Sequence, residues 1–288
     1  MTFKNYKYLG KTVQILLVFL CLYLLISQTN LRFEAIAIPV IATSDIIYIL
    51  LISLSLSLVN WTLESKRWVQ VNKPSILLST SDAFRQNLKA HSAALFSPLK
   101  LGEYPVKLAE FQPKYRKRVA RNILFNNNIQ LFTTLFFGLP ALLLLSLELK
   151  TSYKKELEIS SIALLIGLAI YIAFNKKLIP PFWKSSLFLS VCRYLTFSSA
   201  YIICIYILQP EVHIYTLIIG VYASYLLSSL VSIYSLFDLV FKTSVFLLVL
   251  TSFGVNPEIV LFISLISWVF NAAVPALLGL ALFIPTKR

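Results

Sequence analysis

The sequence predicts an all-α polytopic membrane protein with about eight transmembrane helices. Of its 288 residues, 58% are hydrophobic and only 13% are charged, and the mean hydropathy is +0.79. The apolar residues form long windows, each close to the roughly 20 residues that a helix needs to cross ~30 Å of hydrocarbon. Such lengths favour helices over the shorter strands of a membrane barrel. Because no stretch remains for a sizeable soluble domain, we expect residues 1–288 to form one membrane domain.

The apolar windows predict the spans in order along the chain. They cover residues 12–31, 35–63, 122–147, 159–175, 185–210, 212–237, 239–256 and 259–286. The first window follows three lysines but no small-residue cleavage site, so we expect it to be retained as a span. The last two windows predict a hairpin that turns at residues 254–257. Within the final window, Asn271 and Pro275 predict a kink packed against neighbouring helices.

The distribution of charge predicts the orientation of these spans. Residues 64–121 hold twelve Lys or Arg against four acids. The positive-inside rule places this loop and both termini on the cytoplasmic side of the cell membrane, and residues 148–158 on the outer side. The formal net charge of +14 is then mostly a signal of topology. No nucleic-acid partner is expected, because that would need a soluble basic surface with base-stacking aromatic residues.

The cysteines and histidines do not indicate a metal site or a cofactor. Cys21, Cys192 and Cys204 lie inside apolar windows and show no paired spacing with His91 or His213. Neither a disulfide framework nor a zinc site is therefore expected. The twelve acids are dispersed along the chain, without the clusters that metal-assisted or acid–base chemistry requires. We expect a protein that is not an enzyme.

One segment combines helix breakers with charge between two apolar windows. Pro98, Gly102 and Pro105 interrupt residues 81–111, which are too polar for an ordinary span and too apolar for a solvent loop. Glycine permits a sharp turn, and proline is tolerated in the first turn of a helix. This pattern predicts a re-entrant pair of half-helices, the second starting near residue 103 or 104. The alternative is a juxtamembrane loop whose lysines follow the positive-inside rule.

The charges of this segment suit an anionic head group. A helix N-terminus presents unpaired N–H groups, and Lys100 and Lys107 would add two full positive charges beside it. Glu103 could pair with Lys107 and keep the empty site near neutral. Charged groups at membrane depth are costly, so their presence here marks a candidate functional site.

The run Pro98-Leu99-Lys100-Leu101-Gly102-Glu103 resembles a signature of a known family, the transmembrane flippase domain of lysylphosphatidylglycerol synthases and related stand-alone membrane proteins. It follows Asn60-Trp61 and Lys66-Arg67-Trp68 and precedes the polar run 126–130, and the span count and length agree along nearly the whole chain. The resemblance implies a lipid-translocating fold with two re-entrant elements and no chemistry of its own. Lipid-modifying members carry a soluble aminoacyl-transferase domain that is not found here, so aminoacylation is not expected. The family's second Gly and Glu motif is also missing at its usual place.

A second segment of the chain is similar in sequence to the interrupted segment at residues 97–107. Residues 97–107 and 232–242 share Ser, Leu, an acid and Lys at the same offsets, so Glu103 and Lys107 correspond to Asp238 and Lys242. Duplicated, interrupted segments are typical of repeat-built transporters, and a second re-entrant element would cover residues 232–256. An ordinary ion pair between residues four apart at a helix end explains Asp238 and Lys242 equally well.

Two further polar features lie inside the predicted spans. Arg193 is eight residues into an otherwise uncharged window, so it either finds a partner in a polar cavity or extends back to the cytoplasmic head groups. The third span carries a polar stripe that serves either helix–helix hydrogen bonding or a hydrophilic track for a head group. The stripe consists of Asn122, Asn126, Gln130, Thr133 and Thr134.

These observations predict a lipid transporter, or flippase-like protein, that moves an anionic lipid between leaflets. The lipid would be a phospholipid or a polyprenyl-phosphate carrier. The alternatives are a non-catalytic membrane partner of a lipid or cell-envelope biosynthesis complex and a membrane-embedded lipid transferase, and a homo-oligomer is compatible with each. The predicted substrate-binding residues are Pro98, Lys100, Gly102, Glu103, Lys107, Gln130, Arg193, Asp238 and Lys242.

Overall fold

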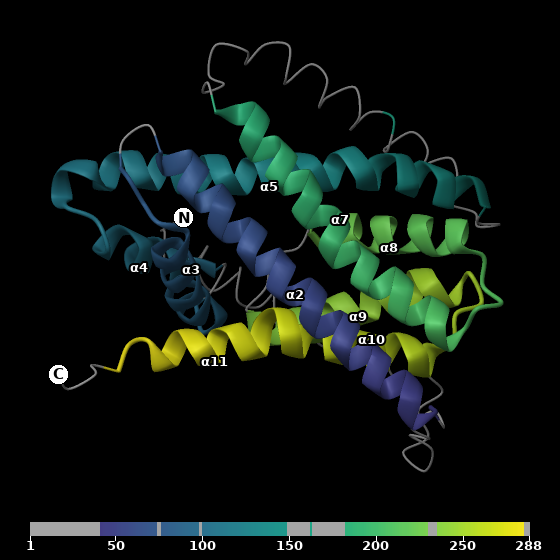
Figure 1. The fold of residues 1–288 in the computed structure, drawn as a ribbon. Coiled ribbons are helices and arrows are strands. Elements are labelled where there is room, and N and C mark those ends of the chain that lie inside the picture. Colours follow the sequence, from purple (N-terminus) through teal and green to yellow (C-terminus); the bar gives the residue numbers. More distant parts are fainter. Residues whose placement is uncertain are drawn as a thin grey trace, which may run out of the picture.

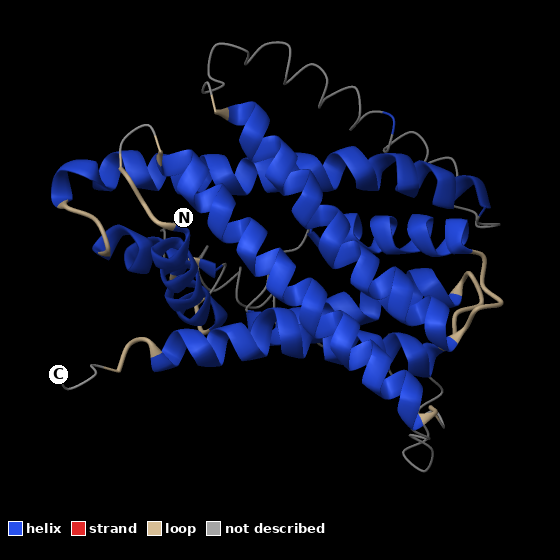
Figure 2. Ribbon diagram, viewed as in Figure 1, coloured by secondary structure: helices blue, strands red, loops and turns tan. Residues whose placement is uncertain are grey.

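A computed structural model shows how these segments pack as a bundle of helices (Figure 1). It describes residues 41–73, 76–97, 100–148, 162, 182–229 and 235–284. Within these ranges the regular structure is helical throughout (Figure 2). The predicted first span, and the fourth apart from residue 162, lie outside the described residues. The predicted all-helical class is confirmed.

Four helical runs in the described part of the chain are long and apolar enough to cross a membrane. They fall on the predicted second, third, fifth and eighth spans. Their bounds are α2 (Thr43–Asn72), α5 (Pro113–Glu148), α7 (Trp183–Leu208) and the run formed by α10 (Pro257–Trp268), η3 (Val269–Ala273) and α11 (Val274–Ala281). Their outer faces carry large apolar side chains, for example Leu58 and Phe188, which are 57% and 67% exposed. Such faces suit contact with lipid tails.

Helices α8 (Ile214–Ser229) and α9 (Ser235–Thr251) cover the described part of the predicted sixth span, residues 212–237, and most of the seventh. Because these two described helices lie side by side and not end to end, they do not form one continuous helix. The two helices approach closely at Gly220, where an added Cβ would lie 2.7 Å from Cδ2 of Leu250. The predicted turn at residues 254–257 is confirmed: Gly254 has a φ of +80°, and the Asn256 side chain caps α10 by accepting from the Glu258 N–H.

The segment predicted as one cytoplasmic loop, residues 64–121, is mostly helical. Helix α2 continues to Asn72, α5 begins at Pro113, and between them lie α3 (Thr80–Leu95) and α4 (Glu103–Ala109). Ser79 starts α3 by accepting a hydrogen bond from the Asp82 N–H. Several charges of this segment pair inside the bundle: Glu64 with Arg67, which was not predicted, and Glu103 with Lys107, which was.

The turn between α3 and α4 is tightly built. An added Cβ on Gly102 would lie 2.3 Å from the carbonyl oxygen of Ala93, so only glycine fits there. The Gly102 N–H donates to Oγ of Ser97 at 2.7 Å. Lys100 has a φ of +57°, a left-handed conformation that non-glycine residues rarely adopt. Helix α4 begins at Glu103, where the sequence predicts a helix start. Pro98 lies outside the described residues.

The predicted kink in the final span is a π-helical turn, η3. The Val274 N–H bonds to the carbonyl of Val269, five residues earlier. In this pattern the Phe270 carbonyl would accept from residue 275, but Pro275 has no N–H. Oγ of Ser57 on α2 donates to that carbonyl instead, at 2.7 Å. The irregular turn is thus held by a side chain from a neighbouring helix.

Apolar clusters occupy both ends of α2 and leave a polar region between them. Ile49 belongs to a cluster formed with α7, α8, α9 and α10, and Trp68 to another formed with α3, α4 and α5. In Figure 1, α5 and the run from α10 to α11 lie along opposite sides of the bundle, and α3 and α4 lie between them at one end. The residues of α2 between the clusters, 53–67, include a buried polar stripe.

Candidate functional site

A cavity of about 600 Å³ lies inside the bundle, between the two apolar clusters. Its volume is in the range of ordinary ligand sites, but its lining is unusually rich in charge. Every long apolar helix contributes to its wall, together with α3, α4, α8 and α9. The structure brings seven of the nine predicted binding residues to this one cavity: Lys100, Glu103, Lys107, Gln130, Arg193, Asp238 and Lys242. Of the other two, Gly102 shapes the α3–α4 turn, and Pro98 is not described.

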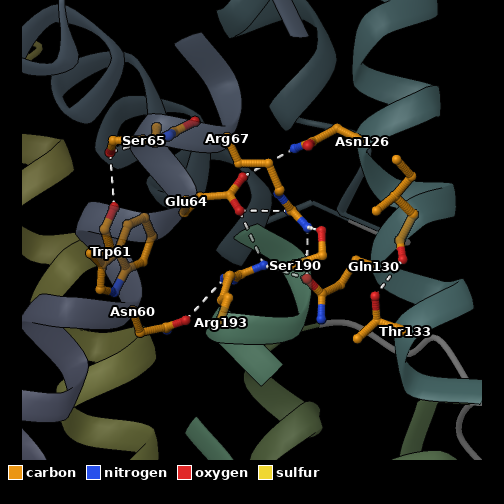
Figure 3. A network of polar contacts seen from close by, with 12 residues as sticks. Asn60, Trp61, Glu64, Ser65, Arg67, Asn126, Gln130, Thr133, Ser190 and Arg193 are labelled. Atoms are coloured by element: carbon orange, nitrogen blue, oxygen red, sulfur yellow. Dashed lines mark hydrogen bonds and ion pairs between the residues drawn. The ribbon is translucent and has the colours of Figure 1, made fainter. Parts of the chain in front are cut away.

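The first charged group of the cavity is centred on Glu64 (Figure 3). Its Oε2 atom lies 2.6 Å from Nη2 of Arg67 and 3.1 Å from Nη1 of Arg193. Both arginines also donate to Oε1 of Gln130, at 2.7 and 3.3 Å. Two guanidinium groups therefore share one carboxylate and one amide oxygen, in a region where water is largely excluded.

Arg193 turns into the bundle. Besides its contacts with Glu64 and Gln130, its Nε donates to Oδ1 of Asn60 at 2.9 Å. Of the two alternatives, a partner in a polar cavity or an extension to the head groups, the structure shows the first. The Arg193 side chain remains 24% exposed, whereas that of Arg67 is only 2% exposed. The two arginines therefore differ in what a ligand could reach.

The polar stripe of α5 forms helix–helix hydrogen bonds at one part and lines the cavity at another. Asn122 donates to Asn72, and Asn126 donates to Glu64, so these two amides tie α5 to α2. Further along, Gln130 and Thr134 line the cavity. The first part of the stripe is helix–helix contact and the second part is cavity wall.

The second charged group is centred on Asp238 at the start of α9. Its Oδ2 atom lies 2.8 Å from Nζ of Lys242, one helical turn later, and 3.7 Å from Nζ of Lys100. Lys100 belongs to the α3–α4 turn, so this contact joins two separate helical hairpins. Asp238 is 15% exposed, and Lys242 and Lys100 are 37% and 48% exposed.

The third charged group is the predicted pair of Glu103 and Lys107, which the structure confirms. Nζ of Lys107 lies 2.7 Å from Oε1 of Glu103 and 4.3 Å from the centroid of the Trp68 ring. The Lys107 side chain is only 2% exposed. It therefore contributes positive charge to the cavity without being free to approach a ligand.

The cavity has a surplus of positive charge. Among the described residues that line it, five are Lys or Arg and three are acids, a formal surplus of two. His91 adds no charge near neutral pH, because burial in α3 lowers its pKa to about 4. Its Nε2 donates to the Ala272 carbonyl of η3 at 3.2 Å, and the Trp61 ring contacts it edge-on.

One side of the cavity is aromatic. Phe197 and Tyr201 from α7, Tyr225 from α8 and Trp268 from α10 line it. Phe197, Tyr201 and Tyr225 pack edge-to-face, with centroids 4.7 and 5.8 Å from that of Tyr225. A lining that combines charged groups with aromatic rings suits an amphipathic ligand.

The sequence analysis missed the residues at the centre of the first charged group. Glu64 and Arg67 were assigned to a cytoplasmic loop, although they lie on the buried face of α2. A helical pattern marks them: Ser53, Ser57, Asn60, Glu64 and Arg67 recur at spacings of three or four. The polar residues keep the same helical spacing from the apolar span into residues 64–67. This spacing predicts that the helix continues and that Glu64 and Arg67 lie on its buried face.

No model of a known protein family matches the chain, and a search of curated proteins finds no match either. The geometry of the cavity therefore carries the functional argument.

Proposed function

We propose that this protein is a lipid transporter that moves an anionic lipid between the leaflets of the cell membrane. The observation that carries the proposal is the cavity: a partly open space with surplus positive charge, inside a bundle whose long helices are apolar enough to cross a membrane. A membrane protein that places eight charged side chains around one space inside its bundle incurs a desolvation cost. Such a cost is expected where a charged substrate must pass.

The cavity supplies a lipid head group with hydrogen-bond donors and positive charge, which the hydrocarbon of the membrane lacks. In lipid, a phosphate has no partners and must shed its water. Along the cavity wall, guanidinium and ammonium groups could form charge-assisted hydrogen bonds with its oxygens. The acyl chains would remain in the surrounding lipid while the head group crosses in the polar space.

We assign the two short hairpins, α3–α4 and α8–α9, to re-entrant elements. Helix α3 has 16 residues, fewer than the roughly 20 that span a bilayer, and α8 and α9 pack side by side, with an added Cβ on Gly220 only 2.7 Å from Cδ2 of Leu250. The positive-inside orientation places the α3–α4 hairpin on the cytoplasmic side and the start of α8 on the outer side. The hairpins would then enter from opposite faces and meet at the contact between Lys100 and Asp238.

This arrangement supports an internal repeat. Each hairpin carries an acid and a lysine four residues apart, and both pairs are formed: Glu103 with Lys107 at 2.7 Å and Asp238 with Lys242 at 2.8 Å. Both pairs line the same cavity. Separation of the hairpin tips would open the cavity to one side of the membrane at a time, as in other repeat-built transporters.

The pairing of the carboxylates favours transport over catalysis. Glu64, Glu103 and Asp238 each contact at least one cation at 2.8 Å or less. Each of these carboxylates is thus already engaged by a cation of its own helix. The cavity therefore favours binding and release of an anion over acid–base chemistry.

Reconstitution in liposomes tests the proposal. A fluorescent anionic phospholipid is placed in vesicles, and its movement between leaflets is followed by quenching with a membrane-impermeant reagent. Wild-type protein should accelerate translocation, and Arg193→Gln and Lys100→Asn should reduce the rate at least about tenfold, since a charge-assisted hydrogen bond contributes roughly 1.5–3 kcal/mol.

The matched control is Lys89→Gln. Lys89 forms a comparable ion pair with Glu110 at 3.0 Å, but it does not line the cavity. This variant should retain the wild-type rate. The proposal is wrong if wild-type protein moves no anionic lipid under any ion gradient in vesicles where an active lipid transporter works.

A further inference from the structure

The arrangement of the charges points to a more specific substrate, and this inference rests on the proposed transport function. We propose that the cavity selects lipids whose head group carries two negative charges, such as a phosphomonoester or a diphosphate diester, over lipids with one negative charge or none.

The first step is that each carboxylate of the cavity has a cation on its own helix. Glu64 pairs with Arg67 three residues later, and Glu103 and Asp238 each pair with a lysine four residues later. These three pairs have contacts of 2.6 to 2.8 Å and are electrically neutral by themselves. The described lining residues then leave two cations without a carboxylate of their own, Arg193 and Lys100.

The second step is that these two cations come from other elements, and each lies farther from its carboxylate than that carboxylate's first partner does. Arg193 is on α7 and lies 3.1 Å from the Glu64 carboxylate, and Lys100 is in the α3–α4 turn and lies 3.7 Å from the Asp238 carboxylate. Each is the second cation at an oxygen that already has a closer partner. Either could turn to a ligand without leaving a carboxylate unpaired.

The third step is access. The side chains of Lys100 and Arg193 are 48% and 24% exposed, whereas Arg67 and Lys107 are each 2% exposed. Lys100 and Arg193, the two cations without a carboxylate of their own, are therefore also accessible to a ligand. The backbone supports this at Lys100, where a left-handed conformation is held beside the tightly packed Gly102.

Charge balance then sets the preference. In a site of low dielectric constant, uncompensated charge is strongly disfavoured. A head group with two negative charges would neutralise the surplus of two, one with a single charge would leave one, and a zwitterion would leave both. Neutralisation of the whole cavity therefore favours the dianion.

The experiment measures lipid binding to the purified full-length chain in a non-ionic detergent at pH 8, by native mass spectrometry. The probes are phosphatidate, phosphatidylglycerol and phosphatidylcholine with identical acyl chains. At this pH a phosphomonoester carries close to two negative charges, because its second pKa is about 6. Wild-type protein should bind phosphatidate at least tenfold more tightly than phosphatidylglycerol, and phosphatidylcholine should bind most weakly.

Single substitutions should shift this selectivity. Lys100→Asn and Arg193→Gln each reduce the surplus to one, so each should lower the preference for phosphatidate over phosphatidylglycerol by a factor of ten or more. Lys100→Asn replaces an exposed residue and should fold even if Arg193→Gln does not. Lys89→Gln removes a positive charge outside the cavity and should keep the wild-type ratio.

Inorganic diphosphate separates a lipid site from a site for a soluble anion. It should displace phosphatidate from the wild-type protein only at concentrations far above those of the lipid. If diphosphate binds more tightly than phosphatidate, the ligand is a soluble anion and the inference is overturned. Equal binding of phosphatidate and phosphatidylglycerol overturns the dianion preference alone and leaves anionic-lipid transport standing. If no anionic lipid binds in preference to phosphatidylcholine, both proposals fail.

Discussion

Nζ of Lys100 lies 3.7 Å from Oδ2 of Asp238, although the two residues belong to different helical hairpins. Asp238 also holds Lys242 at 2.8 Å, so it keeps a close partner when Lys100 moves. The contact joins the tip of the α3–α4 hairpin to the start of α9 without being the main attachment of either residue. Loss of this contact should therefore cost little, because Lys100 is 48% exposed and the Asp238 carboxylate keeps Lys242 as its closer partner.

Lys100→Gly should fold at least as stably as the wild type while losing most of the preference for phosphatidate over phosphatidylglycerol. The φ of +57° at Lys100 costs a non-glycine residue roughly 1 kcal/mol, and glycine removes that strain. The Asp238 contact that is lost contributes little by comparison. Thermal unfolding in detergent measures the first effect and lipid binding the second. Lys100→Val provides the contrast, because a β-branched residue should destabilise the turn; equal stability of the two variants would contradict a strained backbone.

Gly102→Ala should destabilise the protein and distort the cavity. The added methyl group would lie 2.3 Å from the Ala93 carbonyl, so α3 and α4 must separate, with an expected loss of about 1–3 kcal/mol. The comparison is Gly254→Ala. Gly254 also resists substitution, because its φ is +80°, but nothing lies within 4 Å of an added Cβ. Both variants should unfold at lower temperature, and only Gly102→Ala should also lose lipid binding. Retention of lipid binding by Gly102→Ala would show that the turn does not shape the site.

Glu64→Gln should be one of the most destabilising conservative changes in the chain. It leaves the buried Arg67 beside the partly exposed Arg193 with no carboxylate between them, and removal of one partner from a buried ion pair costs about 3–5 kcal/mol. Unfolding by SDS in mixed micelles gives the change in stability. The added substitution Arg193→Gln should restore part of the loss, because it removes one of the two repelling charges.

The exposed pair of Lys89 and Glu110 is the control for this loss. Its side chains are 27% and 32% exposed, and Glu110→Gln should change stability by no more than about 1 kcal/mol. A similar small effect for Glu64→Gln would mean that water reaches the first charged group freely.

The apolar spans and the local pairs could be predicted from the sequence because both depend on neighbouring residues. Hydropathy locates α5 and α7 to within about ten residues at their starts, and helical spacing predicts the contact between Glu103 and Lys107. The continuation of α2 from residue 64 to Asn72 was not predicted, and the reason is physical. Glu64 and Arg67 read as solvated charges in isolation, whereas in the fold they neutralise each other within the helix.

The assembly of the site could not be predicted in the same way. The sequence marks Lys100 and Asp238 as members of similar motifs, but their contact depends on how two hairpins pack. The partners of Arg193 likewise come from α2 and α5, and no spacing along the chain relates them. Sequence patterns thus identify polar residues that an apolar span must accommodate, and tertiary packing decides which of them meet.

Ser57→Ala should destabilise the π-helical turn of the final span by about 1 kcal/mol, a usual value for a hydrogen bond between membrane helices. The Ser57 hydroxyl satisfies the Phe270 carbonyl, for which Pro275 supplies no N–H. The control is Thr62→Ala on the same helix, because the Thr62 hydroxyl is exposed and donates only to the Leu58 carbonyl of its own helix. Unfolding by SDS should distinguish the two variants. Equal stability would show that the turn does not depend on α2.

The last prediction concerns pH. His91 in α3 has a pKa lowered from 6.5 to about 4, chiefly by burial, with the positive charge of Lys100 acting in the same direction. The unfolded chain therefore binds a proton below pH 6.5 that the folded protein does not. Stability from this residue is complete above pH 6.5 and declines as the pH falls towards 4, by at most about 3 kcal/mol. His91→Gln can keep a donor to the Ala272 carbonyl but does not titrate. Between pH 7 and 4.5, the wild type should lose more stability in detergent than this variant, because the acids that titrate in the same range are common to both. Parallel pH profiles would mean that His91 is protonated in the folded protein, and the cavity would then carry a larger positive charge in acid.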